Sequence, residues 1–99
     1  MCAIRHELVI RFRDGSTDVE IDRIIYLVKR MALKLPEVRE IAFNRNHAAG
    51  YSQAIMMVTL DDEAALERFT AHPVYDSILR FVAPMIEDIS ADDYVVRDT

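Results

Sequence analysis

The sequence predicts an α+β fold, a ferredoxin-like β-α-β-β-α-β sandwich in which one four-stranded antiparallel sheet carries helices on one face. Two observations predict this fold. Segments with the period of a strand and segments with the period of a helix follow one another in that order. The third extended segment, residues 51–60, is apolar on both faces, so the far face of the sheet should be covered as well.

The first predicted strand, residues 4–13, alternates between an apolar face and a mostly charged face. His6, Leu8 and Ile10 share the apolar face, which we expect to point toward the helices. The residues Asp-Gly-Ser that follow are typical of a turn, so the strand should end there.

The first predicted helix follows that turn. Thr17 and Glu20 have the spacing of a capping box, and apolar residues then recur at helical spacing until Pro36 ends the helix. Residues 38–44 are expected to form the second strand. A polar loop is expected over residues 44–50.

The second helical region starts after the acidic run at residues 61–63 and is interrupted at His72 and Pro73. Proline suits the first position of a helix and disfavours helix at the residue before it. We therefore interpret His72 as a structural corner whose ring bonds the nearby backbone. The last strand, residues 86–96, places Asp93 on the face that points toward the helices.

The third strand predicts a homodimer. Its alternate residues Ala54, Met56, Val58 and Leu60 suit the core beneath the helices. Ile55 and Met57 point the other way and are also apolar, as is Val9 on the first strand. No further chain is available to cover them, so a second copy of the protein is the simplest cover, and the paired sheets would form an α/β barrel.

The composition fits a single domain over residues 1–99 and lacks the features of several protein classes. The net charge is −5 and basic residues form no block, which argues against a nucleic-acid partner. The longest uncharged stretch is too short and polar to span a membrane, and the N-terminal residues lack a signal-peptide core, so we expect a cytoplasmic protein. The single cysteine and the three separated histidines, among them a solvated His47, predict neither a metal site nor a cofactor.

Four short motifs resemble the stress-responsive A/B barrel family, Dabb. They are His6 in the first strand, Gly50-Tyr51 at the third strand, His72-Pro73 at the helix break and Asp93-Tyr94 in the last strand. The resemblance covers nearly the whole chain and implies a dimeric α+β barrel. A polyketide cyclase of this family uses a Tyr and a His at positions that hold Phe69 and Tyr75 here, so that catalytic pair is not carried over.

The candidate catalytic residues are His6, Asp93 and Tyr75. The first and last strands of a ferredoxin-like sheet are antiparallel neighbours, which should bring His6 and Asp93 together. A carboxylate fixes the tautomer of a histidine and makes it more basic, which suits a general base, and a nearby phenol can stabilise a developing oxyanion. The alternative is a satisfied polar pair that fixes strand register, beside a core tyrosine.

Three hypotheses for function follow. The first is a domain that binds a small apolar or aromatic molecule between helices and sheet. The second is a cofactor-independent enzyme, either polyketide cyclase-like or a lyase or isomerase, and the third is a structural stress protein without a ligand. The side chains predicted to line a ligand cavity are Ile24, Ile25, Val28, Met56, Phe69 and His72.

Overall fold

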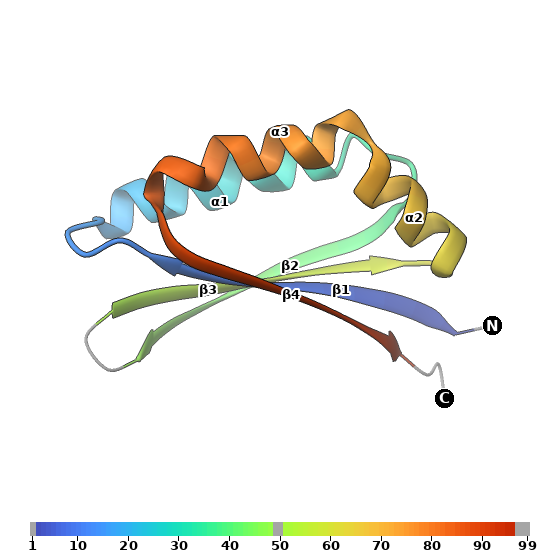
Figure 1. Ribbon diagram of the computed structural model, residues 1–99, viewed down its shortest axis with the longest axis horizontal. Helices are drawn as coiled ribbons and strands as arrows, with labels where there is room; N and C mark the ends of the chain where they lie inside the picture. Colours follow the sequence, from blue (N-terminus) through green and yellow to red (C-terminus); the bar gives the residue numbers. More distant parts are fainter. Residues whose placement is uncertain (1, 49–50, 97–99) are drawn as a thin grey trace.

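A computed structural model describes residues 2–48 and 51–96 of the chain. The elements follow one another in the order β-α-β-β-α-α-β, with a short 3-10 turn before the last strand (Figure 1). They are β1 (Ala3–Phe12), α1 (Asp18–Ala32), β2 (Val38–Ala48), β3 (Tyr51–Leu60), α2 (Glu63–Ala71), α3 (Pro73–Val82), η1 (Ala83–Met85) and β4 (Ile86–Val96).

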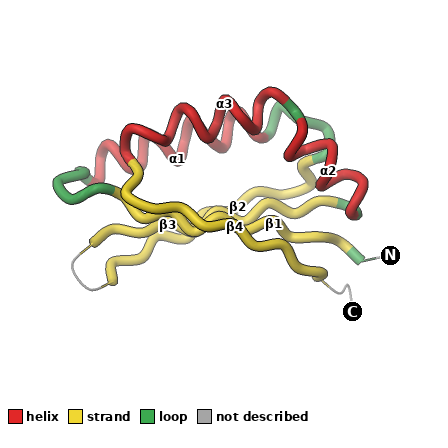
Figure 2. Tube along the Cα trace, in the orientation of Figure 1, coloured by secondary structure: helices red, strands yellow, loops and turns green. Residues whose placement is uncertain are grey.

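The four strands form one antiparallel sheet in the order β2-β3-β1-β4. All helices lie on one side of this sheet, and the two described ends of the chain lie at the same end of the molecule (Figures 1 and 2). This arrangement confirms the predicted ferredoxin-like sandwich. The other face of the sheet, which we call the back face, is covered by none of the described helices or strands.

The helix boundaries arise from local hydrogen bonds. At the start of α1 the Thr17 hydroxyl accepts the Glu20 backbone N–H at 3.2 Å, and the Glu20 carboxylate accepts the Thr17 backbone N–H, so the predicted capping box is confirmed. The turn before it uses Gly15 at φ +89°, a conformation that favours glycine.

The junction between α2 and α3 explains the His-Pro motif. Pro73 occupies the first turn of α3, and Nδ1 of His72 accepts the backbone N–H of Val74 at 3.1 Å. His72 is therefore the C-cap of α2 and the N-cap of α3 at once, and its predicted role as a structural corner is confirmed.

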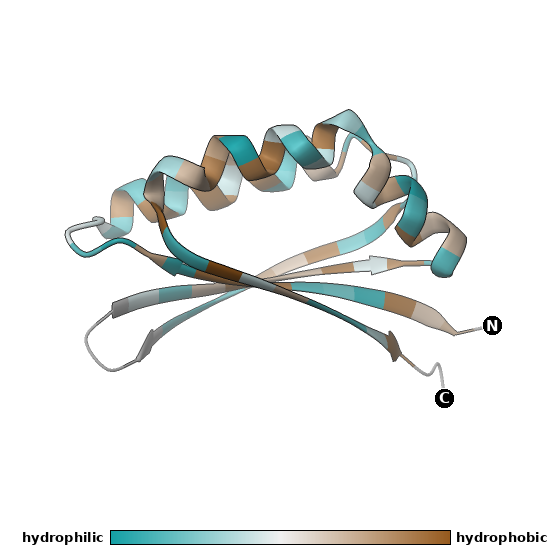
Figure 3. Ribbon diagram, in the orientation of Figure 1, coloured by the Kyte–Doolittle hydropathy of each residue, from teal (hydrophilic) through white to brown (hydrophobic). Residues whose placement is uncertain are grey.

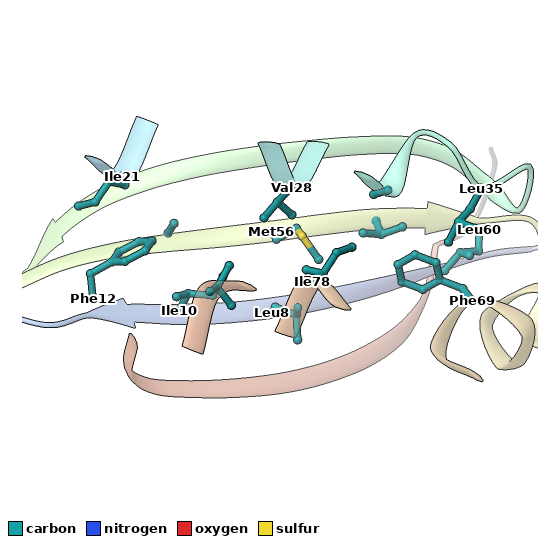
Figure 4. Close-up of a cluster of buried hydrophobic side chains, with 14 of the residues drawn as sticks. Leu8, Ile10, Phe12, Ile21, Val28, Leu35, Met56, Leu60, Phe69 and Ile78 are labelled. Atoms are coloured by element: carbon teal, nitrogen blue, oxygen red, sulfur yellow. The ribbon is translucent and has the colours of Figure 1, made fainter. Parts of the chain in front are cut away.

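The core lies between the helices and the two central strands. Figure 4 shows side chains from β1 and β3 meeting residues of α1, α2 and α3, and Figure 3 shows that the helices alternate between hydrophobic and hydrophilic residues. The alternate residues Ala54, Met56, Val58 and Leu60 of β3 are all fully buried, as predicted. The β1 residues that share this face are Ile4, His6, Leu8, Ile10 and Phe12.

Two predicted boundaries were wrong. β2 runs to Ala48 instead of ending at Asn44, because the hairpin with β3 continues through the polar residues. Asn46 lies opposite Gln53 there and donates to its side-chain oxygen at 3.3 Å. Ladder pairing of the backbone thus overrides the low strand propensity of asparagine. α1 ends at Ala32, some residues before Pro36, and tight turns complete the connection.

Candidate functional site

The candidate site is built around His6, in the middle of β1. Its ring is 3% exposed, because β1 is a central strand and α2 and α3 pack above it. In the sheet register His6 lies opposite Asp93 of β4 on one side and Val58 of β3 on the other. The structure thus brings His6 and Asp93 into contact, as antiparallel pairing of the first and last strands predicts.

Both ring nitrogens of His6 have a partner. Nδ1 hydrogen bonds to Oδ1 of Asp93, and Nε2 lies 2.8 Å from the hydroxyl of Tyr75 on α3. An ionised carboxylate can only accept, so Nδ1 carries a proton; in the neutral ring Nε2 then accepts the proton of the Tyr75 hydroxyl. We call these three residues the Asp93–His6–Tyr75 network, which joins two strands and a helix.

The network has one buried centre and two outer ends. His6 is buried, whereas the Asp93 side chain is 47% exposed and Tyr75 is partly buried. Burial raises the pKa of Tyr75 above its ordinary value of 10.0, and the nearby negative charge of Asp93 raises that pKa further. At neutral pH the Tyr75 phenol is therefore protonated and can donate a hydrogen bond.

Phe69 of α2 closes the site from the side of the core. Its ring is fully buried and contacts both rings of the network edge-on, with centroid distances of 6.0 Å to His6 and 5.2 Å to Tyr75. Such edge-to-face contacts fix ring orientation. Phe69 thereby holds the imidazole and the phenol in their hydrogen-bonded arrangement.

A cleft of about 300 Å³ opens beside the network, between β4 and α2. Its wall includes Asp93, the exposed end of the network, together with the apolar side chains of Ile4, Leu66 and Val95. Glu63, Glu67 and Tyr94 complete the lining of this β4–α2 cleft. Tyr94 belongs to the back face, where its hydroxyl donates to the Glu7 carboxylate at 2.9 Å.

The residues predicted to line a ligand cavity have three different positions. Val28, Met56 and Phe69 belong to the closed core. Ile24 and Ile25 pack against that core and are partly buried, while His72 is exposed at the helix junction. None of these residues is among those that line the β4–α2 cleft.

Sequence reasoning missed most of the β4–α2 cleft. Glu63 and Glu67 had a recognisable signal, since residues four apart lie on one face of a helix. Nothing in the pattern of β4 shows that its helix-facing residues stay uncovered. Among the described residues no three His, Cys, Asp or Glu side chains are placed to hold a metal ion, and no helix is long and apolar enough to cross a bilayer.

Comparison with known proteins places these features in a family context. Residues 4–96 match the model of the stress responsive A/B barrel domain, Dabb. No curated protein matches the chain in sequence.

Among the solved structures that share the fold, three illustrate the range of similarity. A dimeric ferredoxin-like protein of unknown function from Thermobifida fusca is 26% identical, with a TM-score of 0.80 over 96% of this chain and 92% of that protein. A Dabb family protein from Mesorhizobium loti is 23% identical, with a TM-score of 0.81 over 99% and 100% of the two chains. The hydroxynitrile lyase of Passiflora edulis is 19% identical, with a TM-score of 0.80 over 98% and 95%.

Proposed function

This chain belongs to the stress-responsive A/B barrel (Dabb) family, and we propose that it binds a small apolar or aromatic molecule in the β4–α2 cleft, against Asp93, the exposed end of the Asp93–His6–Tyr75 network. The observation that carries this proposal is the placement of Asp93. Its carboxylate lines the cleft while one of its oxygens is held by a buried histidine. A ligand would therefore meet a hydrogen-bond acceptor whose position is already fixed.

The shape and lining of the cleft support this proposal. Its volume of about 300 Å³ is at the lower end of the range found for small-molecule sites, which combine apolar walls with a few oriented polar groups. Ile4, Leu66 and Val95 supply the apolar walls. Burying a ligand's apolar surface against them contributes about 25 cal/mol of favourable free energy per Å² of surface removed from water.

The cavity predicted between helices and sheet stays a prediction. Val28, Met56 and Phe69 are packed together there, so a ligand would have to displace them. We propose instead that Phe69 forms the wall behind the network and limits how deeply a ligand enters.

The binding proposal is tested with 3-phenylpropan-1-ol, an uncharged aromatic probe, titrated into ¹⁵N-labelled protein. We expect saturable shifts of the backbone amides of Leu66, Asp93 and Val95. Asp93→Ala should weaken binding several-fold, because it removes the fixed acceptor. Ile89→Ala, on the same strand but in a separate groove, is the matched control and should leave binding unchanged. If neither this probe nor a set of small aromatic compounds shifts these amides, the structural stress protein without a ligand becomes the better hypothesis.

A second candidate function is cofactor-independent proton transfer, with His6, Asp93 and Tyr75 as catalytic residues. It is favoured by the two hydrogen bonds of His6, which join Asp93, His6 and Tyr75 into one chain. Because both ring nitrogens already have partners, a substrate could not give its proton to His6 directly. The substrate proton would pass to the Tyr75 oxygen while the Tyr75 hydroxyl proton passes to Nε2 of His6. Asp93 would stabilise the resulting imidazolium. The fold is shared with a hydroxynitrile lyase, an enzyme.

Deuterium exchange tests this second function. The α-protons of 1-phenylpropan-2-one exchange with D₂O when a base removes them, and NMR follows the loss of signal. We expect the protein to accelerate exchange and both His6→Ala and Tyr75→Phe to abolish the acceleration. Equal rates in the wild type and both variants would exclude this role for the network, whatever the outcome of the binding titration.

We further propose a homodimer through the back face of the sheet, with Val9, Ile55 and Met57 at its centre. The register places Val9 opposite Ile55, and all three side chains are partly exposed in the single chain. Nε of Arg5, on the same face, is buried without a hydrogen-bond partner in the described part of the chain, beside a hollow of about 210 Å³. A partner subunit would supply an acceptor and cover the apolar centre. The Thermobifida fusca protein of this fold is described as dimeric.

Light scattering after size-exclusion chromatography tests the dimer. The wild type should have twice the chain mass of 11.4 kDa. Ile55→Lys should give a monomer, because it places a charge in the apolar centre of the interface. Val19→Lys on α1, where the valine is already exposed, should not change the mass. A wild-type monomer would disprove the proposed interface.

A further inference from the structure

The charges that line the β4–α2 cleft all have one sign. Glu63, Glu67 and Asp93 contribute carboxylates, and no Lys or Arg is among the lining residues. Glu63 and Glu67 lie four residues apart on α2, where like charges destabilise a helix. Neither glutamate forms an ion pair with a described residue, and the Asp93 side chain, which hydrogen bonds to His6, is 47% exposed.

The acidic lining continues beyond the cleft. An adjoining groove of about 490 Å³ shares Ile4, Glu63 and Val95 with it and is also lined by Asp62, whose carboxylate caps α2. Cys2 and Ala64 complete the lining of this groove. The combined trough therefore has both apolar and acidic lining residues.

Two described arginines near this end of the molecule, Arg39 and Arg68, pair with other carboxylates. Arg39 pairs with Asp61 at 3.9 Å, and Arg68 of α2 pairs with Glu37 at 3.5 Å. Neither arginine lines the cleft or the adjoining groove. Neither of these two arginines therefore neutralises the carboxylates of the trough, and a concave surface concentrates their negative potential.

We infer that the cleft takes amines: compounds in which a protonated amino group is attached to a small apolar or aromatic body. The ammonium would lie between Glu67 and the free oxygen of Asp93, and the apolar body would pack on Ile4, Leu66 and Val95. Carboxylates of the same shape would be repelled. This inference rests on the proposed binding function and gives it a substrate class.

Three probes of equal shape test the charge selection: 3-phenylpropan-1-amine, 3-phenylpropan-1-ol and 3-phenylpropanoate. Each is titrated into ¹⁵N-labelled protein at pH 7.5 while the amides of Leu66, Asp93 and Val95 are followed. We expect the amine to bind roughly three- to tenfold more tightly than the alcohol, since charge pairs at an exposed site add only a modest attraction. The carboxylate should bind more weakly than the alcohol, and added NaCl should reduce the difference between the probes.

Two variants locate the selectivity. Glu63→Gln/Glu67→Gln should remove most of the preference for the amine over the alcohol. Asp14→Asn is the matched control: Asp14 is an exposed acid in the turn after β1, outside the lining of the trough, and its substitution should leave all three affinities unchanged. This control shows whether the loss of an acidic charge outside the trough changes the affinities.

The possible outcomes distinguish the two proposals. If the three probes bind the cleft equally, or if the double variant keeps the full preference for the amine, the substrate class is wrong and the binding function stands. If none of the probes shifts the cleft amides, the binding proposal fails and the inference fails with it. The inference would be established if the amine binds the cleft, the double variant weakens that binding, and Asp14→Asn leaves it unchanged.

Discussion

β3 and β4 are the two neighbours of β1, yet one is buried and the other is exposed. On β3 the alternate residues Ala54, Met56, Val58 and Leu60 are fully buried beneath the helices, and Val58 is the partner of His6. On β4 the residues that point to the same side stay open: Ile89 is 37% exposed and Val95 is 54% exposed. No residue labelled in the core close-up comes from β4 (Figure 4).

This difference shows why the site lies where it does. α2 and α3 cover β1 and β3 but leave the helix-facing side chains of β4 in contact with solvent. His6 on β1 is the last buried residue toward that edge, and Asp93 on β4 is the first exposed one. The network therefore spans the border between a closed core and an open cleft. There its hydrogen bonds can be held in place by the core while one end remains accessible to a ligand.

The largest expected effect comes from a matched pair of valines. Val58→Ala should lower the free energy of unfolding by about 2–3 kcal/mol, because it opens a cavity in the core. Val95→Ala, the same change on β4, should cost at most about 0.5 kcal/mol. Urea unfolding of both variants measures the two losses. Equal losses would mean that β4 is covered in solution.

A smaller effect is expected from the network itself. Tyr75→Phe should lower the free energy of unfolding by about 1 kcal/mol, since it removes the donor to Nε2 of His6 and leaves a buried acceptor unpaired. Tyr26→Phe is the control, because the Tyr26 hydroxyl is exposed and accepts only from Arg30 at 3.3 Å. A loss for Tyr75→Phe no larger than that of the control would argue against the hydrogen bond.

The smallest effect is a pH dependence above neutrality. The pKa of Tyr75 is raised in the folded protein, so its protonated form is favoured by folding. The stabilisation is fully present below pH 10.0, the ordinary value, and is lost as the pH rises through the folded pKa. Absorbance of tyrosinate should show one tyrosine ionising late, and Tyr75→Phe should remove that component. Asp93→Asn should lower this pKa only partly, because burial is the larger cause.

Parts of this arrangement were predictable from the sequence. Period-two alternation gave the orientation of β1 and β3, and antiparallel pairing of the first and last strands placed His6 opposite Asp93. The order of the motifs indicated the family, whose model matches residues 4–96. These features depend on the local pattern of residues and on the order of the elements, and both can be read from the sequence.

Other parts depend on how far the helices extend over the sheet. Ile89 and Ala91 alternate on β4 as Leu8 and Ile10 do on β1, so the pattern could not show that only the β1 residues are buried. The contact between Tyr75 and His6 also requires the position of α3, which the corner at His72 sets. The cleft was missed for the same reason, since it is the space that the helices leave over β4.

The most direct test of the account is the protonation of the His6 ring, observed through its two ¹⁵N resonances in long-range ¹H–¹⁵N spectra at pH 8. The account predicts a proton on Nδ1, which Asp93 accepts in a hydrogen bond, and a shift of the Nδ1 resonance when 3-phenylpropan-1-ol fills the cleft, because Asp93 contacts both ring and ligand. A ring protonated at Nε2, or ring nitrogens that do not respond while the cleft amides do, would contradict it.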